Sequence, residues 1–175
     1  MIQQGWKKIL EVLLENLGTL LDTQAGKIIA TAAVSMIPVV ELRGGIPFGV
    51  LLDLQPVEAY LAAVMGNMVP VPLIIVYIRR VFLWTRRQFP KLGGLVDALE
   101  RKAHLKGRMV LKYRYLGLFI FVALPLPGTG AWTGALAAAF LNMRLRNAAP
   151  SIFMGLLTAG LIVTLLVTGV LQLPL

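Results

Sequence analysis

The chain has 175 residues, of which 58% are hydrophobic and only 14% are charged, and its mean hydropathy is +0.79. This balance exceeds what a soluble core needs, and it predicts a single-domain, multi-pass protein of the inner or plasma membrane. With no cysteine and one histidine, neither a metal centre, another cofactor nor enzyme activity is expected. The formal net charge of +9 is expected to reflect topology and contact with anionic membrane lipids, not nucleic-acid binding.

Residues 1–24 are predicted to form an amphipathic helix in the membrane interface. Apolar side chains recur there at helical spacing, while charged side chains occupy other positions around the helix. Glu11 and Glu15 interrupt the apolar core that a secretory signal would need. Packing of this helix on the protein itself is the alternative.

The apolar segment 28–55 contains two charged residues, Glu41 and Arg43, only two positions apart. Ionisable groups at membrane depth cost about 2.5–3.5 kcal/mol each and usually mark a substrate or proton path, although the two could also form a structural ion pair. Because the segment also contains residues that interrupt helices, it is predicted to be a re-entrant hairpin, with a simple spanning helix as the alternative. The residues expected to shape its tip are Pro38, Gly44, Gly45 and Pro47.

Residues 57–78 are predicted to be the first complete transmembrane helix, bent by Pro70 and Pro72. Within it, Asn67 is either a hydrogen-bond partner of a neighbouring helix or a ligand group.

Segment 79–114 is strongly basic, with eleven Lys and Arg residues against two acidic ones. The positive-inside rule places this loop in the cytoplasm.

The apolar segment 115–143 contains no charge and is flanked by basic residues at both ends. Both ends are therefore predicted to be cytoplasmic, so the segment must turn back within the membrane as a second re-entrant hairpin. Main-chain N–H groups at the start of its second arm could face an anion, and Trp132 could stack on a cationic substrate or simply pack. The residues expected to shape its tip are Pro125, Pro127, Gly128, Thr129 and Gly130.

Residues 148–171 are predicted to be the second complete span, so each half of the chain is a broken segment followed by a full helix. Pro38 and Pro125 are 87 residues apart, whereas Met65-Gly66 and Met154-Gly155 are 89 apart. Because one span separates the halves, they are predicted to be inverted repeats, an arrangement found in many secondary transporters.

The strings PVVELRGGIPFG and LPLPGTGAWTGALAAAF, each followed by a full span, resemble the small multidrug export protein family. That family is similar to a compact relative of the DedA superfamily, which implies opposed re-entrant hairpins and membrane transport. The resemblance implies amphiphilic cations, protons or polyprenyl-phosphate lipids as substrates. Where DedA proteins have arginines in the second hairpin, this chain has Leu124 and Gly130, which argues against phosphate binding there.

The leading hypothesis is a small secondary transporter that couples export of amphiphilic or cationic compounds to protons and works as a homo-oligomer among membrane lipids. Glu41 would be the protonatable carrier, with Arg43 as counter-ion or anion ligand. A lipid flippase, scramblase or polyprenyl-phosphate carrier is one alternative, and a membrane assembly factor without transport is another. The candidate substrate- and proton-binding residues are Glu41, Arg43, Gly44, Gly45, Pro47, Asn67, Pro125, Pro127, Gly128, Thr129, Gly130 and Trp132.

Overall fold

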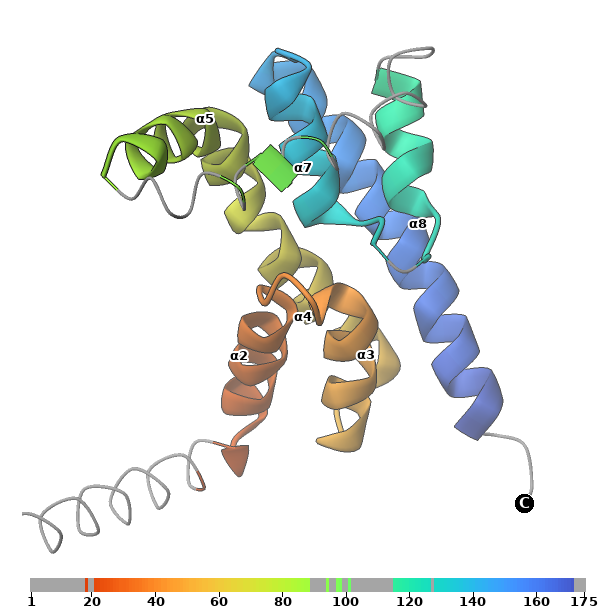
Figure 1. Ribbon diagram of the computed structural model, residues 1–175. Helices are drawn as coiled ribbons and strands as arrows, with labels where there is room; N and C mark the ends of the chain where they lie inside the picture. The colour runs from red at the N-terminus through yellow and green to blue at the C-terminus, as the bar shows by residue number, and fades with distance from the viewer. Residues whose placement is uncertain are drawn as a thin grey trace, which may run out of the picture.

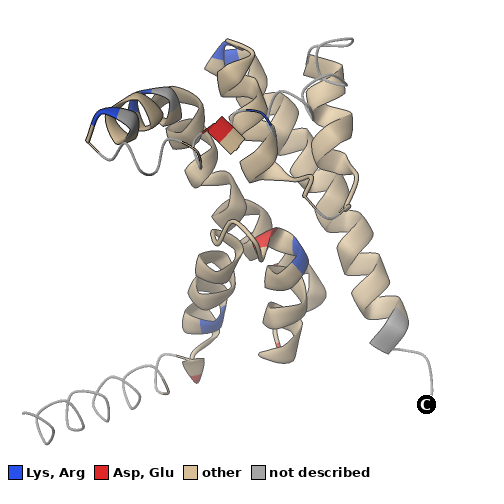
Figure 2. Ribbon diagram, in the orientation of Figure 1, with Lys and Arg blue, Asp and Glu red and all other residues tan. Residues whose placement is uncertain are grey.

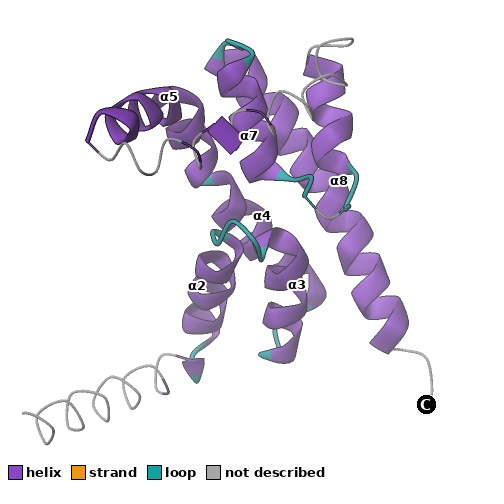
Figure 3. Cartoon of the chain, viewed as in Figure 1, coloured by secondary structure: helices purple, strands orange, loops and turns teal. Residues whose placement is uncertain are grey.

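The computed structural model describes residues 21–88, 115–126 and 128–171, together with isolated positions at 18, 94, 97, 98 and 101. Figure 3 shows that these residues form helices joined by short loops, without strands, which confirms the all-α prediction. Most of the amphipathic helix predicted over 1–24, most of the basic segment and Pro127 lie outside the described residues.

The first broken segment forms a hairpin of two short helices, α2 (Gln24–Ser35) and α3 (Glu41–Leu51), joined by a turn at residues 36–40. The Thr23 hydroxyl begins α2 by accepting a hydrogen bond from the Gly26 N–H at 3.0 Å.

The expectation that Gly44, Gly45 and Pro47 shape the tip of this hairpin is wrong, because all three lie within α3. Gly45 instead lets the two arms approach each other. A Cβ atom at Gly45 would lie 1.8 Å from the Ser35 hydroxyl oxygen, so a larger residue would push α2 away.

The chain then continues through α4 (Pro56–Met68) and α5 (Pro70–Gln88), with an interruption at Val69, directly before the first proline of the expected bend. The stretch Pro56–Ile78 is long and apolar enough to cross a membrane. Helix α5 runs ten residues into the segment expected to be a loop, where Phe82 packs against Phe140 with ring centroids 5.7 Å apart. This packing explains why the helix continues past the apolar stretch.

The second broken segment forms another hairpin, made of helix 115–123, a turn whose described residues are 124–126 and 128–130, and α7 (Ala131–Phe140). It is followed by α8 (Leu145–Leu171), whose stretch Leu145–Gly169 is also long and apolar enough to cross a membrane. The hairpin packs closely on α8: a Cβ atom at Gly155 would lie 2.7 Å from the Val122 Cβ.

The two hairpins lie with their turns facing each other (Figure 1). The first hairpin packs on α4, and α7 of the second packs on α5 and α8. Helices α4 and α8 join the halves, and the Tyr60 hydroxyl donates a hydrogen bond to the Leu157 carbonyl oxygen at 3.1 Å.

Close contacts in the first hairpin recur in the second at nearly constant sequence offsets. In each half, one glycine lets the two arms meet and a second glycine lets the following helix approach the first arm. The corresponding contacts are Gly45 with Ser35 and Gly134 with Val122, then Gly66 with Ala32 and Gly155 with Phe119. The glycines are 89 residues apart and their partners 87, which are the same two offsets that the sequence pattern gives.

The ends of α3 and α7 are also built alike. Each helix is followed by a residue in the left-handed conformation, Asp53 (φ 62°) and Asn142 (φ 53°). The next residue then donates its N–H to the carbonyl five positions back, from Leu54 to Gly49 and from Met143 to Ala138. Both hairpins therefore end in the same type of C-terminal cap before the next helix begins.

Gly66→Ala should lower the stability of the protein by about 1–3 kcal/mol, because the new Cβ would overlap the main chain of α2. A Cβ atom at this position would lie 2.1 Å from the Ala32 carbonyl oxygen, which cannot move without moving α2. Thermal unfolding in detergent measures the change. Gly169→Ala is the matched control, since no atom lies within 4 Å of its added Cβ; equal melting temperatures for the two variants would contradict the packing described here.

Candidate functional site at the meeting of the two turns

Glu41 begins α3 in an unusual backbone conformation and points at the other hairpin. Its φ is 50°, its side chain is only 6% exposed, and the left-handed region costs a residue with a Cβ about 1–2 kcal/mol. The carboxylate lies directly against Gly130, where an added Cβ would be 2.0 Å from Oε2. Gly130 itself has φ 139°, a conformation that favours glycine. A strained residue thus meets a glycine in a conformation that other residues rarely adopt, and such strain is common at functional sites.

The Glu41 carboxylate occupies the start of α7. Gly130 is the N-cap residue of α7 and has no side chain to accept the first N–H groups of the helix. The main-chain N–H of Trp132 instead donates a hydrogen bond to the Glu41 carboxylate. An acidic group from the first hairpin therefore caps a helix of the second and faces the positive end of its dipole.

Arg43 reaches the other side of the same break. Its guanidinium donates hydrogen bonds to the carbonyl oxygens of Leu126 and Thr129 and, at 3.0 Å, to the Thr129 hydroxyl oxygen. These carbonyls follow the C-terminal end of helix 115–123, where a cation is favoured and main-chain oxygens lack helical partners. Glu41 and Arg43 thus contact opposite ends of one broken helix.

Thr129 fixes the shape of the second turn. Its hydroxyl lies 2.7 Å from the Leu124 carbonyl oxygen and 2.8 Å from that of Leu126, and it accepts the Leu126 N–H at 3.2 Å. The Thr129 hydroxyl therefore helps to hold the turn whose oxygens accept hydrogen bonds from Arg43.

Trp132 makes the reciprocal contact. Its indole N–H donates a hydrogen bond at 3.1 Å to the carbonyl oxygen of Met36, which is the C-cap residue of α2. Each hairpin turn therefore accepts a hydrogen bond from an N–H of a side chain in the other hairpin. Both donors, Arg43 and Trp132, lie near the start of the second helix of their own hairpin.

Asn67 is completely buried in α4, and neither its side-chain oxygen nor its nitrogen has a hydrogen-bond partner among the described residues. The expected hydrogen bond to a neighbouring helix is therefore not present in the described part of the chain. Buried polar groups almost always find partners because leaving them unpaired is costly.

The structure brings together five of the residues proposed from the sequence: Glu41, Arg43, Thr129, Gly130 and Trp132. Pro125 and Gly128 lie in the second turn, and Gly128 has φ 78°. Sequence reasoning did not find the main-chain oxygens of Met36, Leu124 and Leu126. Their only signal is that each lies within two positions of a proline in a broken segment, where carbonyl groups lose their helical partners.

Charged groups are otherwise sparse in this part of the molecule. Figure 2 shows mostly uncharged ribbon, with an acidic and a basic position at the start of α3, where the hairpins meet.

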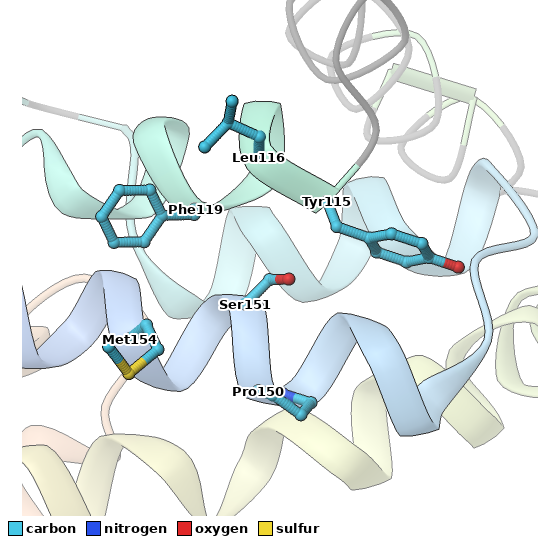
Figure 4. Close-up of a pocket in the computed structure, with 6 residues that line it drawn as sticks. All are labelled: Tyr115, Leu116, Phe119, Pro150, Ser151 and Met154. Carbon is cyan, nitrogen blue, oxygen red and sulfur yellow. The ribbon is translucent and has the colours of Figure 1, made fainter.

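An open groove elsewhere on the molecule does not involve these charges. It lies between helix 115–123 and the first part of α8 (Figure 4) and is lined mainly by apolar groups. The Ser151 hydroxyl within it donates at 3.0 Å to the Asn147 carbonyl of its own helix. The groove therefore offers little for specific polar recognition.

Comparison with known proteins gives one match. A family model with the description "Putative small multi-drug export protein" matches residues 41–162. The match begins at Glu41 and covers α3, α4, α5, the second hairpin and most of α8. No curated protein and no solved structure matches the chain.

Gly130→Ala should destabilise the protein by about 2 kcal/mol or more, since the new Cβ meets both an unfavourable φ and the Glu41 carboxylate. Thermal unfolding of Gly130→Ala, Glu41→Ala and the double variant separates the two effects. If the carboxylate lies on Gly130, the glycine substitution should cost less once Glu41 has been truncated. Strictly additive losses would show that the two residues do not touch.

Thr129→Val should cost about 0.5–1.5 kcal/mol, because it keeps the shape of the side chain but removes the hydroxyl that bonds to the Leu126 N–H, to the turn carbonyls and to Arg43. Thr158→Val is the control, as the Thr158 hydroxyl donates back to the Met154 carbonyl in its own helix at 3.0 Å. Chemical denaturation in mild detergent compares the two variants. Equal losses would mean that Thr129 has no special role in the turn.

Proposed function

Since the chain belongs to the small multi-drug export protein family, we propose that it is an integral membrane transporter that exports small amphiphilic or cationic compounds in exchange for protons. Glu41 is the residue through which the two are coupled. The observation that carries the proposal is a buried carboxylate held between two broken helices, at the point where both hairpins meet.

Placement in a membrane is supported by length, composition and surface. Two helical stretches are long and apolar enough to cross, and large apolar side chains are exposed along α4, α5 and α8. Such a surface would be unfavourable in water and is what lipid requires. Examples of these exposed side chains are Leu61, Met65, Leu73, Leu161, Leu165 and Leu166.

The hairpins are proposed to be re-entrant. Helices α2, α3 and α7 have 12, 11 and 10 residues, and at 1.5 Å per residue such arms reach about 15–18 Å, roughly half of the hydrocarbon core. Turns that face each other then meet near mid-membrane. The recurring glycine contacts and caps support inverted repeats, with the basic segment 79–114 in the cytoplasm.

One carboxylate that accepts either a proton or a cation gives exchange. An empty, charged carboxylate is costly to carry through an apolar interior, so the protein changes conformation most easily when Glu41 is neutralised. In the present arrangement the charged group is held by the start of α7. Neutralisation by a proton or a cation weakens that attachment and frees the two turns to separate.

Lipid movement is the weaker alternative. A phosphate headgroup would need a free cation within the membrane, whereas Arg43 is already bound to oxygens of the second turn.

With only two spans, one chain encloses little by itself, so the proposal includes a homo-oligomer.

Glu41→Gln should abolish proton-driven transport while leaving the protein folded, because the amide cannot exchange a proton at this site. The measurement is uptake of tetraphenylphosphonium into proteoliposomes under an imposed pH gradient. Glu58→Gln is the matched control, since Glu58 belongs to the capping box that begins α4 and glutamine can fill that role. Full transport by Glu41→Gln would overturn the proposal. Gradient-independent lipid exchange would favour a scramblase, and neither activity would favour an assembly factor.

A further inference from the structure

Asn67 is the one polar group in the described part of the fold that is fully buried with both side-chain atoms unpaired. An amide left in this state costs more than an apolar side chain of the same size. Its presence therefore needs a reason beyond packing.

The register between α3 and α4 places Asn67 at the same level as Glu41 along the two helices. The two helices are antiparallel neighbours joined by residues 52–55, and a Cβ atom at Gly49 would lie 2.8 Å from the Ala59 Cβ. Since both helices rise about 1.5 Å per residue, eight positions back along α3 and eight forward along α4 reach the same level. Those positions are Glu41 and Asn67.

The second hairpin gives the same register independently. There an added Cβ at Gly134 would lie 3.8 Å from an Ile152 side-chain atom. Four positions back along α7 and four forward along α8 reach Gly130 and Leu156. At the 89-residue offset these are the counterparts of Glu41 and Asn67.

The counterpart of the unpaired amide is thus a buried leucine, Leu156, with 1% exposure. The fold accepts an apolar side chain of similar size at this position, so packing does not require the asparagine. The two polar residues, Glu41 and Asn67, lie in the same half of the chain and at the same level, whereas their counterparts in the other half are Gly130 and Leu156.

We propose that Asn67 is a substrate-binding residue, whose side-chain oxygen accepts a hydrogen bond from the N–H of a protonated amine while Glu41 neutralises its charge. The inference rests on the proposed function for the choice of cations as ligands. The Arg43 guanidinium already donates hydrogen bonds to three oxygens of the second turn. The Glu41 carboxylate is therefore the charged group that a ligand would bind. Amines that carry an N–H are thereby distinguished from quaternary cations, which can use the carboxylate alone.

The test compares octyldimethylamine, which is protonated at neutral pH and has one N–H donor, with octyltrimethylammonium, which has none. Their dissociation constants are measured with the purified full-length protein by competition with tetraphenylphosphonium. Asn67→Leu should weaken binding of the amine about tenfold or more and change that of the quaternary cation less than about twofold. Asn147→Leu, the same change at an exposed position on α8, should affect neither.

Thermal unfolding supplies the second measurement. Because an unpaired amide is replaced by the residue type used at the equivalent position, Asn67→Leu should unfold at the same or a higher temperature than the wild type. A lower melting temperature, or failure to fold, would mean a structural hydrogen bond and would overturn the proposal. Equal weakening of both cations, or unchanged amine binding, would also overturn it, the latter showing that water alone satisfies the amide.

The two proposals fail in different ways. If Asn67→Leu selectively loses amine binding but the protein shows no proton-driven transport, the role of Asn67 would be supported and the proposal of export would be overturned. Proton-driven transport with no difference between the two cations would retain export and overturn the role of Asn67.

Discussion

The structure depends on one set of polar contacts, through which two charged side chains of the first hairpin bind main-chain groups of the second. A helix that breaks at membrane depth exposes N–H groups at one end and carbonyl groups at the other, and lipid cannot satisfy either. Here Glu41 binds the N–H end at α7, and Arg43 binds the carbonyl end at Leu126 and Thr129. The spacing of two residues matters because it lets one turn of α3 reach both ends of the break. Trp132 returns the interaction by donating to Met36, so neither turn is satisfied without the other.

Much of this could be predicted from the sequence because its signals are strong ones. Long apolar stretches gave the helices, and prolines and glycines within apolar segments gave the two breaks. The position of a charged pair in one break indicated its importance. What could not be predicted is which groups the charges bind, since main-chain carbonyls carry no sequence signature. Gly45 was misplaced for a related reason: a glycine that permits helix packing looks the same in sequence as one that forms a turn. The unpaired state of Asn67 likewise depends on its neighbours in space.

The two halves share packing but not chemistry. Their glycine contacts and helix caps correspond, whereas Glu41, Arg43 and Asn67 stand opposite Gly130, Trp132 and Leu156 in the second half. This division has a physical advantage. The half without charges supplies main-chain groups fixed by Thr129, and the other half supplies side chains that can change protonation or partner. The proposed exchange of a cation for a proton needs such a contact, because the contact is strong while the carboxylate is charged and weakens when that charge is neutralised.

The most direct measurement of the central claim is the distance between the two turns in a lipid bilayer. Since the chain has no cysteine, spin labels can be placed at Val39 and Leu126, whose side chains are exposed, and the separation read by pulsed electron resonance. If the turns meet through Glu41 and Arg43, the distances should centre well below the thickness of the hydrocarbon core, about 30 Å. A distribution centred at that thickness or beyond would place the turns at opposite faces of the membrane and contradict the account.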